Sequence, residues 1–396
     1  MTIAAESRSG QSATVWWNDP RIRSTLFQAV LIVVVAGAVA WLIHNTITNM
    51  ARSHLTSGFD YLAQVAGFPI SQRPIDYVVG VSSYGRALAV GMLNTLIVAA
   101  IGIVLTTILG FTVGIARLSS NWLIARIATV YVETIRNIPL LLQLLFWYTV
   151  LRLPMPVPKQ SFNIADSIFI NQRGFYFPAP HWGDAAVLSA VALIVGVAAT
   201  AFYVRWANRR QEATGRRPPV LIVALALVVG LPALVFVLSG SPVTLDYPAL
   251  KGFNIAGGAT VGPEFFALVL GLVIYTASFI AEIVRGGIRA VSYGQTEAAR
   301  ALGLPSGKTL RLVVIPQAIR VIIPPLTNQY LNLTKNSSLA HFIGFPDLVL
   351  VNETVMNQTN RSIEGIAIVM SIYLIISLVT AAFMNWFNKR VALVER

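Results

Sequence analysis

The sequence predicts an all-α membrane protein with about eight transmembrane helices. Of its 396 residues, 56% are hydrophobic and only 11% are charged, whereas soluble domains average roughly 25% charged residues. The apolar residues gather in runs of roughly 18 residues or more, the length at which one helix crosses the hydrocarbon core. Short basic clusters separate these runs, as they do where charge orients a membrane protein. The formal charge of +13 therefore predicts a lipid bilayer as partner and no nucleic acid.

The first half of the chain is expected to hold three spans. Residues 38–40 fit a signal-peptidase site, but the apolar run continues beyond them, which favours an uncleaved anchor. The third span runs from about residue 124 to 151 and includes Pro139. Small residues in the second span would let another helix approach closely, namely Gly91, Gly102, Gly110 and Gly114. The segments in order are a leader at 1–25, a first span at 26–44, an outer segment at 45–85, and spans two and three at 86–151.

The second half is expected to add an inserted hairpin and three further spans. Residues 152–183 are rich in proline and aromatic residues, which predicts an ordered loop without helix. Two apolar runs, 185–204 and 220–238, form the hairpin around an arginine-rich linker. Outer loops and the hairpin occupy 152–262, and a core segment follows at 263–388. This core segment holds spans six to eight, at 263–284, 312–332 and 363–387, and a polar loop at 291–316. A tail at 389–396 ends the chain.

Basic residues set the orientation of the chain. With the N-terminus inside and eight alternating spans, 19 of the 29 Lys and Arg residues fall on the inner side and nine on the outer side. Because positive charge is retained in the cytoplasm, this bias predicts that the N- and C-termini are both cytoplasmic. It also predicts a cytoplasmic position for the polar loop at 291–316.

Several chemistries are disfavoured by the residues present. The chain has no cysteine, and its four histidines lack metal-ligand spacing, so no metal site is expected. The stretch Gly303–Thr309 resembles a phosphate-binding P-loop, but three residues rather than four separate its glycines and no strand is expected before it. We therefore expect no nucleotide or other cofactor on this chain. Without HExxH, GxSxG or paired intramembrane aspartates, an enzyme is not expected either.

The polar loop carries a motif with fixed spacing. Its positions are Glu297, Ala298, Ala299, Gly303, Val313, Ile315 and Pro316. A short helix ending at Gly303, where glycine permits a left-handed turn, would project from the membrane as a knob. The motif resembles the EAA loop of permeases from ATP-binding-cassette (ABC) importers, with Val and Ile in place of the usual Ile and Leu. The resemblance implies that Glu297 and its neighbours dock on a separate ATPase, which would bind ATP and Mg²⁺. The alternative is an ordinary loop of helix-forming residues.

The third span holds a second pattern, in which Glu133, Arg136 and Gln143 lie among apolar and aromatic residues. It is similar to the third span of polar amino acid permeases of the histidine/glutamine type, and a match around 281–288 extends the similarity. The resemblance makes these three residues candidates for the transport pathway. The alternative is a local Glu133–Arg136 pair at i, i+3 that only orients helices. Ionisable groups within a membrane must pair or face a cavity, so both readings stay open.

A polar helical face is expected beyond Pro316. Asn328, Asn332, Lys335 and Asn336 recur at i, i+4, i+7 and i+8, and Ser337 follows them. Unpaired amides are costly in hydrocarbon, so this face predicts a wet cavity or a permease interface. There Lys335 could attract the carboxylate of an amino acid. The alternative is hydrogen bonding between helices of two permease subunits.

The stretches that match lie in spans two, three, six, seven and eight, and the resemblance implies that these form a five-helix core of the type I permease kind. The remaining segments are additions, and residues 58–70 resemble the long permease of general L-amino acid importers of Gram-negative bacteria. The resemblance implies an inner-membrane permease that moves L-amino acids into the cytoplasm by alternating access. Its partners would be two ATPase subunits, a second, paralogous permease, and a periplasmic binding protein. An ion- or proton-coupled secondary transporter is the alternative, and Glu133 is its one evident deep carboxylate.

Overall fold

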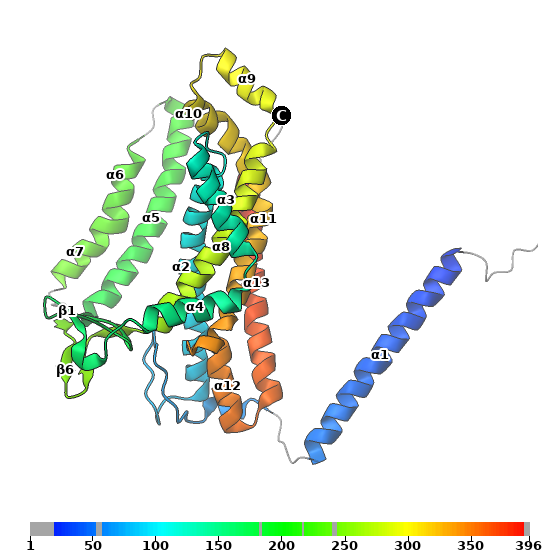
Figure 1. Ribbon diagram of the computed structural model, residues 1–396, viewed down its shortest axis with the longest axis vertical. Coiled ribbons are helices and arrows are strands. Elements are labelled where there is room, and N and C mark those ends of the chain that lie inside the picture. Colours follow the sequence, from blue (N-terminus) through cyan, green and yellow to red (C-terminus); the bar gives the residue numbers. More distant parts are fainter. Residues whose placement is uncertain (1–19, 53–57, 182–183, 216–217, 240–243, 392–396) are drawn as a thin grey trace, which may run out of the picture.

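The structure is a computed structural model that describes residues 20–52, 58–181, 184–215, 218–239 and 244–391. Long helices run side by side and short strands gather at one end of the bundle (Figure 1). The predicted all-α membrane fold is confirmed, with the strands as an addition. The helices are α1 (Pro20–Arg52), α2 (Tyr84–Ala116), α3 (Trp122–Arg136), α4 (Leu140–Arg152), α5 (Asp184–Thr214), α6 (Val220–Leu225), α7 (Leu231–Leu238), α8 (Pro263–Arg289), α9 (Tyr293–Ala301), α10 (Ser306–Thr309), α11 (Ile315–Asn336), α12 (Leu348–Thr359) and α13 (Ser362–Val391).

Within the described residues, seven helical segments are long and apolar enough to cross a membrane, and the pair α3 and α4 is an eighth candidate. The span predicted over 124–151 is therefore not one continuous helix, because its two helices are bent by 107° relative to each other. Pro139 lacks an amide hydrogen and so cannot bond the carbonyl of Ile135. The side chain of Gln143 donates to that carbonyl instead, at 2.9 Å, and to the carbonyl of Ile138 at 3.0 Å. The bend is therefore stabilised by a buried amide.

Helix α8 is the centre of the bundle and packs against α2, α3, α4 and α11. Glycines of α2 make the closest of these approaches possible. A Cβ atom on Gly110 would lie 2.5 Å from Ile280 Cγ2, and one on Gly114 would lie 2.8 Å from the carbonyl oxygen of Ala281. Any larger side chain would push the two helices apart. The close approach predicted from small residues in the second span is confirmed.

Residues 58–83 pack onto the ends of α2 and α12. This segment has one short 3-10 helix, η2 (Asp60–Ala63), and otherwise irregular backbone. Tyr61, Phe68 and Tyr77 are buried in a cluster with Leu348 of α12. The Tyr77 hydroxyl donates to the carbonyl of Phe68 at 2.7 Å, which fixes the turn between them. By contrast, α1 stands apart from the bundle in Figure 1, and its described side chains are almost all exposed.

Short strands enclose the base of the inserted hairpin. Proline and aromatic residues predict only an ordered loop here, and the strands are a finding of the structure. Strand β3 pairs with β8 and β4 pairs with β5, so segments on either side of the hairpin are hydrogen-bonded to each other. The strands are β1 (Phe162–Ile164), β2 (Ile168–Asn171), β3 (Gly174–Phe177), β4 (Ala179–His181), β5 (Thr244–Asp246), β6 (Ala249–Lys251), β7 (Asn254–Ala256) and β8 (Ala259–Val261).

The hairpin itself consists of α5 packed against α6 and α7. A π-helical turn, η4 (Ala226–Gly230), joins α6 to α7. Gly196 of α5 lies directly against the carbonyl oxygen of Leu227 in that turn, where a Cβ atom would overlap it. The hairpin therefore depends on a glycine at its own crossing point.

Candidate functional site

The knob predicted in the polar loop is formed by α9. Its last turn ends at Gly303, whose φ of +76° lies in the left-handed region. The amide of Gly303 donates to the carbonyl of Arg300 at 2.9 Å, and the amide of Leu304 donates to the carbonyl of Ala299 at 3.1 Å. This is the Schellman arrangement that closes helix ends. The left-handed turn predicted at Gly303 is confirmed.

Helix α9 lies at the opposite end of the bundle from the strands (Figure 1). Glu297 and Ala298 are exposed on this helix, whereas the side chain of Ala299 is buried. Within the described residues, the Glu297 carboxylate forms no hydrogen bond or ion pair. An exposed acid beside two small residues can receive a basic group and allow close approach by a partner surface.

The segment after Gly303 continues without interruption into the bundle. Helix α10 passes through a π-helical turn, η5 (Leu310–Val314), into α11, and together they form one helical span from Ser306 to Ile343. Pro316 lies in the first turn of α11 and is exposed. The stretch that resembles a P-loop, Gly303–Thr309, forms the turn after α9 together with α10, so a helix and not a strand precedes it. Because the helix from Ser306 is uninterrupted, a displacement of the knob would be passed along α11.

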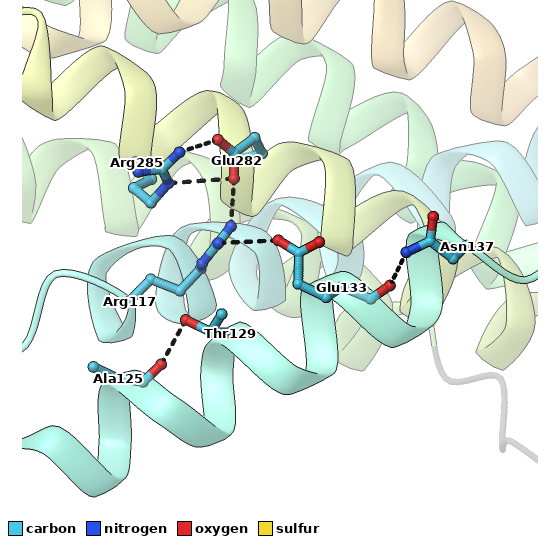
Figure 2. Close-up of polar contacts among 7 residues, drawn as sticks. All are labelled: Arg117, Ala125, Thr129, Glu133, Asn137, Glu282 and Arg285. Atoms are coloured by element: carbon cyan, nitrogen blue, oxygen red, sulfur yellow. Dashed lines mark hydrogen bonds and ion pairs between the residues drawn. The ribbon is translucent and has the colours of Figure 1, made fainter.

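Four charged side chains join α2, α3 and α8 (Figure 2). Arg117, directly after α2, is only 8% exposed and donates to the Glu282 carboxylate of α8. Its Nη2 atom also lies 3.5 Å from Glu133 Oε1 of α3. Arg285 binds Glu282 through two hydrogen bonds, of which the Nε bond is 3.2 Å long. We call these residues the ionic cluster.

The ionic cluster gives Glu133 a basic partner other than Arg136. The Glu133 carboxylate faces Arg117, and the alternative of a local pair with Arg136 is not formed, whereas a role of Glu133 in the pathway stays a prediction. The guanidinium of Arg136 instead lies 5.0 Å from the centroid of the Phe279 ring, a cation–π contact. Arg117 is the residue that sequence reasoning missed. Glu282 within an apolar span was the available signal, because an ionisable group inside a membrane span requires a partner or a cavity.

Gln143 and Ser337 are engaged with the backbone. The buried Gln143 amide serves the bend between α3 and α4. Ser337 is buried too, and its hydroxyl donates to the carbonyl of Thr334 at 2.7 Å. Neither side chain lies on an open surface in this chain. Gln143 and Ser337 could line the pathway only if these hydrogen bonds to the backbone were broken first.

The predicted polar face of α11 is present and uncovered. Asn328, Asn332 and Lys335 are exposed, and Asn336 is half-buried. None of the four side chains has a hydrogen-bond or ion-pair partner among the described residues. Lys335 borders a groove of about 550 Å³ against α13, where Ser371 is among the lining residues. This face needs water, substrate or a second subunit to satisfy its polar groups.

Residues 106–393 match the family described as "Binding-protein-dependent transport system inner membrane component". The chain belongs to this family. It is thus the membrane-spanning permease of an importer, a subunit without enzymatic activity that works with a binding protein and a separate ABC ATPase. The coupled secondary transporter is set aside.

Curated relatives of this permease cover almost the whole chain. It is 53% identical to the "General L-amino acid transport system permease protein AapQ" of Rhizobium johnstonii, over 96% of this chain and 94% of that protein. It is 48% identical to the "Putative amino-acid ABC transporter permease protein YhdX" of Escherichia coli, over 98% and 99%. It is 41% identical to the "Glutamate/glutamine/aspartate/asparagine transport system permease protein BztB" of Rhodobacter capsulatus, over the full length of both. The similarity therefore includes the first helix and the hairpin.

Proposed function

We propose that this permease moves L-amino acids into the cytoplasm, with Glu297 on α9 as its contact to the ATPase. The observation that carries the proposal is the position of Glu297, an exposed acid in the middle of α9 that has no partner among the described residues. The knob continues through α10 into α11, which carries the uncovered polar face. The substrate class rests on the printed names of the relatives.

The proposed assembly contains two ATPase subunits and a second, paralogous permease. ATP and Mg²⁺ would bind to the ATPases, and this chain would hold no cofactor. The second permease would face the polar side chains of α11, because those amides and Lys335 have no partners within the part of the chain that the structure describes. The space between the two permeases would then be the pathway, lined on this side by Asn328, Asn332, Lys335 and Asn336.

The proposed orientation places α9 and the C-terminal end of α13 in the cytoplasm. Both lie at the same end of the bundle in Figure 1, and α1 begins at about mid-height of the bundle and runs toward the opposite end. Residues 58–83 and the strands would then face the periplasm. They are the surfaces proposed to meet the periplasmic binding protein.

Alternating access follows from this arrangement. Closure of the ATPases would displace α9, and the continuous helix from Ser306 would carry the displacement to the polar face of α11. The ionic cluster joins α2, α3 and α8 and would keep these helices together during the movement. The permease itself has no chemical step to perform.

The test is a charge reversal at Glu297. The Glu297→Lys variant should lose ATP-driven uptake and retain less ATPase on purification, while membrane insertion stays normal because the side chain is exposed. The matched control is Lys308→Glu, a charge reversal of equal size and opposite sign at an exposed position of α10, which should leave uptake closer to that of the native chain. Normal uptake by Glu297→Lys would remove Glu297 from the contact. Accumulation of a substrate other than amino acids by the native complex would refute the substrate class independently.

A further inference from the structure

The inserted hairpin carries an exposed apolar groove. The groove measures about 740 Å³ and is lined by Ala198, Ala199, Phe202, Tyr203 and Trp206 of α5 and by Leu227 of η4. These α5 positions follow a spacing of three and four residues, so they share one helical face. The crossing of Gly196 against the carbonyl of Leu227 brings the two helices together beneath this face.

Aromatic and basic side chains continue the groove toward one end of α5. The rings of Tyr203 and Trp206 lie 5.4 Å apart, and the guanidinium of Arg210 lies 5.1 Å from the centroid of the Trp206 ring. Arg205 and Arg209 are exposed on the same turns. None of these three arginines forms an ion pair with a described residue. The groove therefore ends in a group of exposed arginines that are not ion-paired to any described residue.

The arginines lie near the C-terminal end of α5. The arginine end of α5 is at the same end of the bundle as α9 and α10, opposite the strands (Figure 1). Tryptophan and tyrosine concentrate where hydrocarbon meets the headgroup layer. The aromatic part of the groove is thus at headgroup level, and the part near Ala198 extends into the hydrocarbon.

We infer that this groove is a binding site for an anionic phospholipid. Its acyl chain would lie along Ala198 and Phe202, and its phosphodiester would face Arg209 and Arg210. An apolar trough in a membrane must be filled by hydrocarbon, since water there would lack hydrogen-bond partners. The arginines select among lipids, because a zwitterionic headgroup brings a cation of its own to the same place. Each basic group near an anionic headgroup layer contributes about 1 kcal/mol, equivalent to roughly five-fold in affinity.

The site would anchor a helix pair that has little contact with the core. The packing partners of α5 are α6, η4 and α7, all within the hairpin. A bound lipid would fill the groove between them and add contact area at the headgroup layer. This role is separate from transport and from the contact at Glu297.

The experiment measures lipid retention by the purified native complex in nanodiscs of phosphatidylcholine, with and without phosphatidylglycerol, by native mass spectrometry. The intact complex should retain phosphatidylglycerol in preference to phosphatidylcholine. Arg210→Gln should weaken that retention roughly five-fold. Ala198→Phe fills the groove with no change of charge and should also weaken retention. Because both side chains are exposed, both variants should assemble normally.

The control is Arg390→Gln at the end of α13. Its guanidinium lies 5.5 Å from the Trp386 ring, so the local contact is the same, but it does not line the groove. Retention should not change in this variant. Equal loss in Arg390→Gln and Arg210→Gln, unchanged retention in Ala198→Phe, or equal retention of the two lipids by the intact complex would each overturn the inference.

Discussion

The guanidinium of Arg117, at the end of α2, is hydrogen-bonded to the carboxylate of Glu282 on α8 (Figure 2). Arg285 holds the same carboxylate, and Glu133 of α3 lies on the other side of Arg117. One nearly buried side chain thus connects three helices close to the point where α8 leads into α9. This connection is the basis of the first prediction.

Replacing Arg117 with glutamine should destabilise the helix bundle. Glu282 would keep Arg285 but lose its link to α2, and hydrogen bonds to charged groups contribute about 1.5–3 kcal/mol. Thermal unfolding of the purified complex should show a lower midpoint. The control is Glu133→Gln, because the Glu133 side chain is 61% exposed and such pairs contribute about 1 kcal/mol or less. Equal stability of Arg117→Gln and the native chain would show that the cluster does not hold α2 and α8 together.

Gly303→Ala should impair coupling to the ATPase. At φ +76° a side chain costs about 1–2 kcal/mol, so the turn after α9 would be strained and the knob displaced. Gly307→Ala is the control, because it lies in α10 with no atom within 4 Å of a new Cβ. The readout is the amount of transport per ATP hydrolysed. Equal coupling in the two variants would indicate that the left-handed turn is not needed.

Asp347 should make stability depend on pH. Asp347 is the buried N-cap residue directly before α12. Its carboxylate accepts a hydrogen bond from the amide of Leu350 at 2.9 Å. Burial raises the pKa of Asp347 to about 6. An unfolded aspartate has a pKa of about 3.9. The folded state therefore holds the proton more tightly, and this group lowers the free energy of unfolding as pH rises from about 4 to 6.

Asp347→Asn should remove that dependence while keeping the helix cap. Above pH 6 the variant should be more stable than the native chain, by up to roughly 3 kcal/mol. Thermal unfolding measured from pH 4 to 7 tests this. Asp347→Ala is the comparison, since it also loses the pH dependence but forfeits about 1 kcal/mol of capping. An unchanged pH profile in Asp347→Asn would assign the dependence to another group.

Lys335→Gln should weaken substrate recognition if α11 lines the pathway. Loss of an ammonium that faces a carboxylate would raise KM for uptake by roughly ten-fold or more. Assembly should be normal, because Lys335 is exposed and forms no ion pair with a described residue. The control is Thr112→Ala, another exposed polar side chain within a span. Unchanged KM would assign Lys335 to the interface between subunits.

The candidate site was predictable where its signal is local in sequence. The turn at Gly303 follows from one glycine after a short helix, and the face of α11 follows from helical spacing. The partner of Glu133 was not predictable, because Arg117 is 16 residues away and reaches it only when α2 and α3 fold against each other. The same holds for Gln143, whose role depends on the bend at Pro139.

The sequence by itself determined the all-α membrane fold, the approximate spans and the coupling motif, since hydrophobic runs, small residues and fixed spacing act along the chain. Tertiary structure decided the right-angled break between α3 and α4, the strands that close the hairpin, and the connection of Arg117 to Glu282. These features depend on contacts between distant segments. A proline allows a helix to bend or to end, and only the packing around Gln143 and α8 determines which of the two occurs.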